Sequence, residues 1–188
     1  MQPARAPLPV LAAGDVRLLP LGSADRDDLQ TACAEDPDIW QIYSVSLLGG
    51  AFDDWWAAHV DRPSEWRMFA IHAGDRLAGM TGFAVDVRHP GVVEVGNTYL
   101  RPAMRATYVN RRAKWLILSW LFGAGFHRVE FRVDDRNARS KAAVRKLGAR
   151  HEGLLRRHKR THTGFVRDTN VFAITDDDWP AIEAALRP

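Results

Sequence analysis

The sequence contains one cysteine, Cys33, and this scarcity excludes an internal disulfide. A reducing, cytoplasmic compartment is therefore expected. Nothing near Cys33 would activate its thiol, so we interpret it as buried or idle rather than nucleophilic. The chain also lacks any apolar run that approaches the length of a bilayer-spanning helix, so no membrane association is expected.

Charge of one sign is not in strong excess either. The net charge is +3, too small to indicate nucleic-acid binding through the whole surface field. His151, His158 and His162 have no cysteine partner and few acidic neighbours, so no metal site is expected. The run RRHKRTH could contact RNA phosphate, but a charged strand edge is the simpler interpretation. Nucleic acid is thus not an expected partner.

The 188 residues fit a single domain with a sizeable core, covering residues 1–188. Hydrophobic residues make up 46% and charged residues 26%, as is typical of a globular protein. The first 14 residues contain three prolines and are expected to form a loose tail.

Apolar patterning gives the order of the elements. Alternating or continuous apolar runs predict strands at residues 16–21, 67–73, 76–87, 92–100, 128–134, 153–160 and 165–174. Three- and four-residue spacing predicts helices at residues 23–34, 52–60, 106–122, 139–147 and from 179 onward. Residues 67–100 are expected to form an antiparallel meander, and residues 153–174 a hairpin. The sequence therefore predicts one mixed α/β domain.

The turn before the helix at residues 106–122 has no glycine between Arg101 and Lys114. A helix N-terminus offers unpaired N–H groups and the positive end of the helix dipole, so it can hold an anion. Five basic residues lie around it: Arg101, Arg105, Arg111, Arg112 and Lys114. This favours a diphosphate site over an ordinary solvated helix start, because a basic first turn is unfavourable without an anion.

Three polar residues near strand ends are candidates for chemistry. Glu94 lies in a mostly apolar strand, where burial could raise its pKa and make it a general base, although solvent-facing strand glutamates are common. Asn137 could cap the next helix or form hydrogen bonds with an amide-bearing ligand. Ser140 could donate a proton or be an ordinary surface serine. Gly96 would let a ligand or a bulge approach the backbone.

Aromatic residues gather in the N-terminal half and form either core or the walls of a cleft. They are Trp40, Tyr43, Phe52, Trp55, Trp56 and Trp66.

In this order, the elements resemble the GNAT superfamily of N-acetyltransferases, in particular the branch of ribosomal-protein N-terminal acetyltransferases. Four stretches between Glu94 and Trp179 carry the resemblance: EVGNTYLRP, RATYVNRRAK, VEFRVDDRNARSKAAVRKLGARHEGLLRRH and RDTNVFAITDDDW. It implies a central mixed β-sheet splayed between two parallel strands, with helices on both faces. It also implies acetyl-CoA as cofactor, a primary amine as acceptor and a possible homodimer.

The resemblance implies a role for each site residue. Pantetheine would lie between the strands at residues 92–100 and 128–134, and the diphosphate on the turn that begins at Arg105. The implied cofactor-binding residues are Asn97, Tyr99, Leu100, Arg105, Ala106, Thr107, Tyr108, Val109, Asn110, Asn137 and Ser140. The implied substrate-binding residues are Trp40, Tyr43, Trp55, Trp56 and Glu94.

The catalytic residues would be Glu94 as base and Ser140 as proton donor to the sulfur. Many family members use a tyrosine as this donor, at the position that Val144 occupies here. Two family glycines are replaced by Ala106 and Tyr108, and helical φ/ψ is expected to suit both.

The acceptor is left open between a protein N-terminal amine and a small molecule such as an aminoglycoside or an amino-acid-like toxin. Two alternatives belong to other classes. One is an acyl-CoA-binding protein without activity, and the other is an RNA-associated role through residues 156–160.

Overall fold

The computed structural model describes residues 7–62 and 64–188. Its strands form one sheet in the order β1-β2-β3-β4-β5-β6-β8-β7, in which β5 and β6 are parallel and all other neighbours antiparallel. The strands are β1 Leu11–Ala13, β2 Val16–Pro20, β3 Trp66–Ala73, β4 Arg76–Val85, β5 Val92–Leu100, β6 Arg128–Asp134, β7 Arg150–Arg160 and β8 Val166–Thr175. The predicted mixed α/β class is confirmed.

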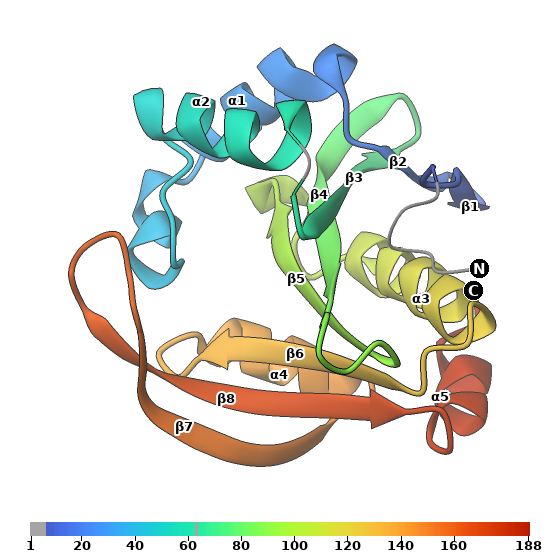
Figure 1. Cartoon of the computed structure of the whole chain (residues 1–188). Helices are drawn as coiled ribbons and strands as arrows, with labels where there is room; N and C mark the ends of the chain where they lie inside the picture. The colour runs from blue at the N-terminus through green and yellow to red at the C-terminus, as the bar shows by residue number, and fades with distance from the viewer. Residues whose placement is uncertain (1–6, 63) are drawn as a thin grey trace.

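Helices lie on both faces of this sheet, as Figure 1 shows. The α-helices are α1 Arg26–Ala34, α2 Gly50–Trp56, α3 Tyr108–Gly123, α4 Ala138–Lys146 and α5 Trp179–Leu186. Short helical segments are η1 Ser23–Asp25, η2 Pro37–Ile42, η3 Ala57–Asp61 and η4 Pro102–Met104. Within the described ranges, no helix is both long and apolar enough to cross a bilayer.

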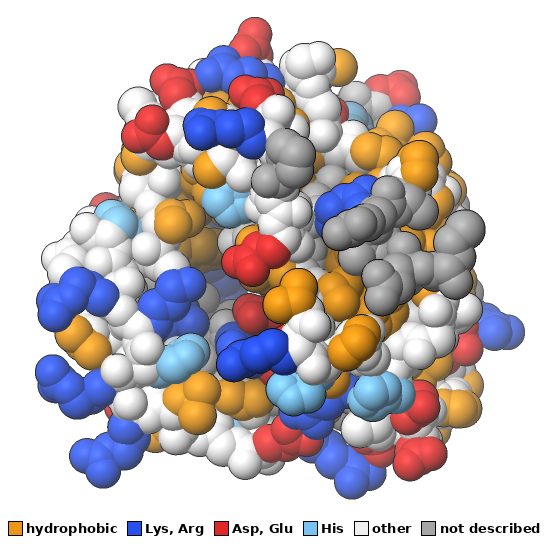
Figure 2. All heavy atoms as spheres, in the orientation of Figure 1, with side chains coloured by type: hydrophobic (Ala, Val, Ile, Leu, Met, Phe, Trp, Pro, Cys, Tyr) orange, Lys and Arg blue, Asp and Glu red, His pale blue; other side chains and the backbone are white. Residues whose placement is uncertain are grey.

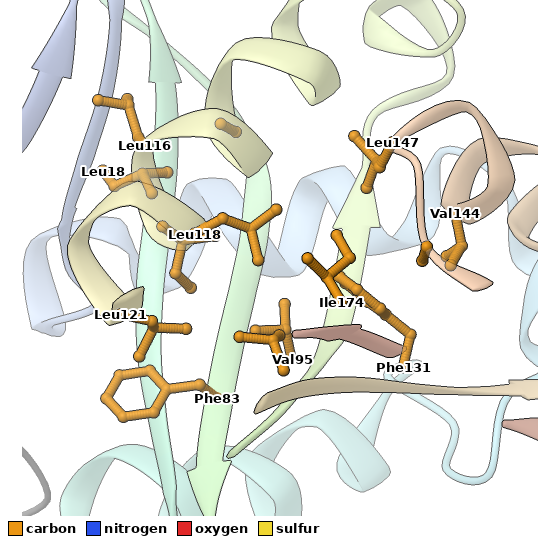
Figure 3. Close-up of a cluster of buried hydrophobic side chains, with 14 of the residues drawn as sticks. Leu18, Phe83, Val95, Leu116, Leu118, Leu121, Phe131, Val144, Leu147 and Ile174 are labelled. Carbon is orange, nitrogen blue, oxygen red and sulfur yellow. The ribbon is translucent and has the colours of Figure 1, made fainter. Parts of the chain in front are cut away.

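Two buried clusters hold the helices against the sheet. One lies between the sheet and α3, α4 and α5, and it is continuous from Leu18 and Phe83 under α3 to Val144 of α4 and Leu147 at its C-terminal end (Figure 3). The other lies under α1, η2 and α2 on the opposite face, and it contains Cys33. Burial raises the pKa of the Cys33 thiol to about 12, as expected for an idle thiol. The two clusters divide the sheet into an α3 face and an α1/α2 face.

The predicted meander, α3, β6, α4 and the C-terminal hairpin all occur within about two or three residues of their expected bounds. The prediction of a loose tail is wrong in part, because β1 lies within these residues and pairs with β2, with Leu11 opposite Leu18. A strand of three residues is too short to show an alternating pattern. Residues 1–6 of the expected tail lie outside the described residues.

The β7–β8 hairpin is long and curved, and its tip reaches back to the segment that follows η2 (Figure 1). The His162 backbone N–H donates to the Ser44 carbonyl at 3.0 Å, and the ring Nε2 is 2.8 Å from the Trp40 carbonyl. These contacts fix the hairpin tip opposite the end of β5, on the α1/α2 face.

Candidate active site

A wedge opens between β5 and β6. The two strands pair at Val92–Arg128, Val93–Val129 and Glu94–Glu130, and then they separate. Beyond that point β5 remains paired with β4 as far as Leu100, and β6 with β8 as far as Asp134. Each strand therefore presents a free edge to the gap, as the resemblance implied.

Side chains satisfy part of the free edge of β5. The Tyr43 hydroxyl donates to the Thr98 carbonyl at 2.8 Å, and Arg105 Nε donates to the Leu100 carbonyl at 2.9 Å. These carbonyls would accept from a neighbouring strand in a continuous sheet. The edge is thus prepared for hydrogen bonds that do not come from β6.

A bulge shapes β5 beside the wedge. Asn97 has φ +48°, and the register with β4 shifts between Met80 and Gly82. Gly96 accommodates an aromatic ring rather than a ligand, since an added Cβ would lie 2.8 Å from the Trp66 indole. The bulge redirects the strand so that Thr98 faces α3 and Tyr99 faces the opposite core.

The turn from Arg105 to Asn110 leads into α3. Thr107 is its N-cap, and its hydroxyl oxygen accepts from the Val109 N–H at 3.3 Å. The helix begins at Tyr108, and Ala106 has φ +59°. The expectation of a helical conformation for Ala106 is therefore wrong: the chain turns sharply between η4 and α3, and only a left-handed residue makes that turn.

We expect Ala106→Gly to increase the free energy of unfolding by about 0.5–1 kcal/mol, because glycine adopts positive φ without a Cβ clash. Urea unfolding checks this. The matched control, Ala143→Gly inside α4, should lower it by a similar amount, since glycine weakens a regular helix. A loss of stability in both variants would contradict the assigned strain.

Tyr108 turns away from the expected phosphate position. Its hydroxyl donates to Asp15, and the Arg112 guanidinium lies 4.8 Å from its ring centroid. The hydrogen bond to Asp15 raises the pKa of Tyr108 and lowers that of Asp15. Tyr108 therefore leaves the N–H groups of the first turn uncovered instead of binding an anion with its hydroxyl.

Most of the basic residues expected around this turn have partners within the protein. Ion pairs link Arg101 to Asp28 and Glu35, Arg105 to Asp36, and Arg112 to Asp15. Arg111 donates to the Ala185 carbonyl at 2.5 Å, and Lys114 points into the core. Acidic residues distant in sequence thus neutralise the basic turn. Most contacts to an anion here must therefore come from main-chain N–H groups and the helix dipole.

One donor of the turn is still available. Among the described residues, Arg105 Nη2 and Asn110 Oδ1 are buried without a hydrogen-bond partner. Buried polar groups are normally satisfied; Arg105 Nη2 is a donor and suits an anion, whereas Asn110 Oδ1 is an acceptor and does not. The free strand edges, the uncovered helix start and this donor together fit the amides and diphosphate of coenzyme A. The side chains of Tyr99, Leu100 and Val109 are core residues, so they can contribute only their backbone.

Glu94 occupies the last paired position before the wedge opens, and its side chain lies on the α1/α2 face. Arg132 Nε is 3.6 Å from its carboxylate. Burial raises the pKa of Glu94, while Arg132 opposes that shift. The carboxylate is partly accessible, with 29% of its side chain exposed. A carboxylate that is partly accessible and has a raised pKa suits a general base.

Asn137 and Ser140 lie at the start of α4. Asn137 is the N-cap, and its Oδ1 accepts from the Ser140 N–H at 2.9 Å. It lines a cleft of about 410 Å³ together with Ile39 and Ile42 of η2. The Ser140 hydroxyl has no hydrogen-bond partner within the part of the chain that the structure describes. Capping and ligand contact remain compatible, since capping uses only the amide oxygen.

The aromatic residues expected to contact substrate are mostly core. Trp40, Trp55 and Trp56 are each less than 5% exposed and pack in the cluster under α1 and α2. They support the site from behind and cannot touch a substrate directly. Tyr43 is the exception, because it is partly exposed and bonds the wedge edge. Sequence reasoning overestimated this set because apolar size does not distinguish a core from a cleft.

Sequence reasoning counted Lys114 among the cations around the turn and missed that it is buried. Its Nζ is fully buried and donates to Thr81 Oγ1 at 2.8 Å and Thr98 Oγ1 at 2.7 Å. Burial lowers its pKa to about 7. A signal was present: Lys114 precedes the buried Leu118 and Leu121 by four and seven residues, so it lies on a buried helix face.

Within the described residues, no group of His, Cys, Asp and Glu could hold a metal ion.

Comparison with known protein families identifies one match. The family model described as acetyltransferase (GNAT) domain matches residues 15–150. The chain belongs to this family. A structure from Chromobacterium violaceum ATCC 12472, described as a probable GNAT-family acetyltransferase, is 30% identical with TM-score 0.83 and covers 93% of this chain and 91% of its own.

Two further solved structures are similar. A GCN5-related N-acetyltransferase from Brucella melitensis has TM-score 0.88 and 25% identity over 100% of this chain and 86% of its own. Mycobacterium smegmatis RimJ, in complex with CoA-disulfide, has TM-score 0.78 and 21% identity over 96% of this chain and 91% of its own. At this identity the similarity shows the shared fold alone. No curated protein matches the chain. The GNAT assignment supports acetyl transfer from acetyl-CoA.

Proposed function

We propose that this protein transfers an acetyl group from acetyl-CoA to a primary amine by direct attack in a ternary complex. The observation that carries the proposal is the wedge between β5 and β6, with Glu94 at its narrow end. Pantetheine amides can pair with free strand edges as an added strand would. The start of α3 then holds the diphosphate through its N–H groups and dipole.

Acetyl-CoA supplies the acetyl group as a thioester. An amine must lose a proton before it attacks, because an ammonium ion has no lone pair. Glu94 accepts that proton, directly or through one water molecule. Backbone N–H groups of residues 97–100 on the wedge edge stabilise the negative charge that develops on the carbonyl oxygen. Ser140 Oγ donates a proton to the departing sulfur. Much of the rate comes from holding the two substrates together.

The acceptor is a peptide N-terminus or a small amine. Membership of the family supports an amine acceptor, and the partial exposure of Tyr43 and Glu94 supports entry of the acceptor beside them. A free-thiol release assay with acetyl-CoA and a panel of amines and N-terminal peptides tests the proposal. Calorimetry with coenzyme A runs beside it. Coenzyme A binding without thiol release would identify an acyl-CoA-binding protein, and no heat at millimolar coenzyme A would refute the site altogether.

Ser140→Ala should lower kcat about 10-fold or more while coenzyme A affinity stays within about twofold, because a proton donor acts only in the reaction step. The Asn137 cap remains intact, since it uses the Ser140 backbone N–H. Steady-state kinetics and calorimetry measure both values. An unchanged kcat would remove Ser140 from the mechanism.

A further inference from the structure

Arg167 of β8 is a buried cation without an acidic partner. The residue is 8% exposed, and its Nε donates to Thr169 Oγ1 at 3.0 Å. Its terminal nitrogens have no partner among the described residues, yet they are not sealed from solvent. Burial lowers the pKa of this guanidinium. A buried charge without a counter-ion is costly, so its retention indicates a ligand.

The carboxylates around Arg167 are already committed to other cations. Asp134 pairs with Arg136 at 2.8 Å, and Glu94 lies 3.6 Å from Arg132. Glu130 pairs with both Arg128 and Arg132. Asp134 and Glu94 still oppose the lowering of the Arg167 pKa, but neither forms an ion pair with the guanidinium.

One further cation and one neutral histidine lie beside Arg167. Lys159 pairs with Arg167 across the β7–β8 hairpin, is exposed and makes no ion pair with a described residue. His158 Nδ1 lies 3.1 Å from the same Thr169 hydroxyl that Arg167 contacts. Burial and the nearby cations lower the pKa of His158, so it stays neutral and uncharged at physiological pH.

The register places Arg167 at the wide end of the wedge. Its neighbour on the same face, Thr169, pairs with Asp134, the last residue of β6. Phe172 and Ile174 of β8 belong to the core of the α3 face, so Thr169 and Arg167 face the opposite side. Glu94 shares that side, because Val93 and Val95 belong to the same core. Figure 2 shows this face hollowed between the helices and the hairpin, with Lys and Arg side chains bordering the hollow.

This placement separates Arg167 from the diphosphate. The start of α3 lies on the other face of the sheet, so coenzyme A phosphates are not its partner. The remaining ligand on the α1/α2 face is the acetyl acceptor. A guanidinium with two free terminal nitrogens matches the two oxygens of one carboxylate.

We propose that the acceptor amine carries a carboxylate, which Arg167 receives while the amine lies at Glu94. The inference rests on the proposed acetyl transfer and narrows its acceptor. The carboxylate comes either from the acceptor's own α-carboxyl group or from an acidic side chain near a peptide N-terminus. Arg167 then orients the acceptor and does not take part in proton transfer.

Matched acceptor pairs test this by thiol release from acetyl-CoA. The first pair is glutamate and its diamide, and the second is a tripeptide amide that begins Ser-Asp and its Ser-Asn counterpart. We expect kcat/KM to be at least about 10-fold higher for the carboxylate member of one pair, which also identifies the source of the carboxylate. Arg167→Met should remove that preference through KM and leave the neutral member unchanged.

Three controls keep the outcomes separate. Arg167→Lys keeps the positive charge but cannot bind a carboxylate through two nitrogens, so it should restore only part of the preference. Arg160→Met, at the exposed end of the same hairpin, should leave the preference unchanged. Circular dichroism and coenzyme A calorimetry establish that each variant is folded and that the cofactor site is intact. Calorimetry with N-acetylglutamate and N-acetylglutamine, in the presence of coenzyme A, measures the affinity of the pocket without turnover.

Equal kcat/KM within both pairs, or an equal loss for both members in Arg167→Met, would overturn the carboxylate assignment. A preference for O-phosphoethanolamine over ethanolamine, without one in the carboxylate pairs, would also overturn it. If no amine is turned over although N-acetylglutamate binds through Arg167, acetyl transfer fails while the anion pocket stands. If neither N-acetyl compound binds and no pair is discriminated, the pocket itself is refuted.

Discussion

Lys114→Met should increase the free energy of unfolding at pH 7 by about 2–4 kcal/mol, a large gain for a single substitution. The ammonium group is buried without a carboxylate and contacts only two threonine hydroxyls. Methionine has a similar length and no charge to desolvate. Thr81 and Thr98 keep a partner in the variant, because their hydroxyls already lie 2.8 Å apart.

The pH dependence of the free energy of unfolding tests the same prediction independently. Burial lowers the pKa of Lys114 from 10.5 to about 7, so between these values the unfolded chain holds a proton that the folded chain has released. Wild-type stability should therefore rise with pH across this window, by at most about 1.4 kcal/mol per pH unit from this group. Below pH 7 both states are protonated and the full cost of the buried charge remains.

Urea unfolding at pH 7, 8 and 9 measures this slope. Lys114→Met should lose the Lys114 part of the slope, and Lys146→Met, on the exposed surface of α4, should keep it. A Lys114→Met protein that is less stable than wild type at pH 7 would show that the lysine's hydrogen bonds outweigh its desolvation. The assigned cost would then be wrong.

The elements that could be predicted are those with strong local signals. The meander of β3, β4 and β5 alternates over long runs and ends at clear turn residues, and α3 has an apolar stripe from Val109 to Leu121. Glu94 was found because a carboxylate interrupts an apolar strand. The separation of β5 from β6 was expected only from the family resemblance, since strand pairing is a long-range property that periodicity does not contain.

The errors have a common physical cause. The arginines around the α3 start looked free because their partners lie far away in sequence: Arg101 pairs with Asp28, and Arg112 with Asp15. Ala106 was expected to be helical because no local sequence signal indicates an alanine with positive φ. Arg167 was not singled out, because an arginine in a charged hairpin is usually solvated and only the folded sheet buries it. Local patterns locate elements, whereas ionic partners and burial depend on the tertiary fold.

Glu94→Gln should reduce kcat/KM for acetyl transfer by about 100-fold or more, because the amide cannot accept the proton of the attacking amine. Coenzyme A affinity should stay within about twofold, since Glu94 lies on the α1/α2 face, away from the start of α3 where we propose that the diphosphate binds. The substitution keeps the shape of the side chain. Glu152→Gln is the matched control, because Glu152, on the edge strand β7, is a more exposed carboxylate that pairs with Arg128 of β6.

The pH profile distinguishes a base from a residue that only holds Arg132 in place. Burial raises the pKa of Glu94, so its carboxylate becomes protonated and inactive as the pH falls, starting above the ordinary range of glutamate. The wild-type kcat/KM should therefore fall on the acidic side with a slope of one proton, and Glu94→Gln should lose that limb. A variant with reduced activity and an unchanged acidic limb would assign the proton transfer to another group and leave Glu94 a structural partner of Arg132.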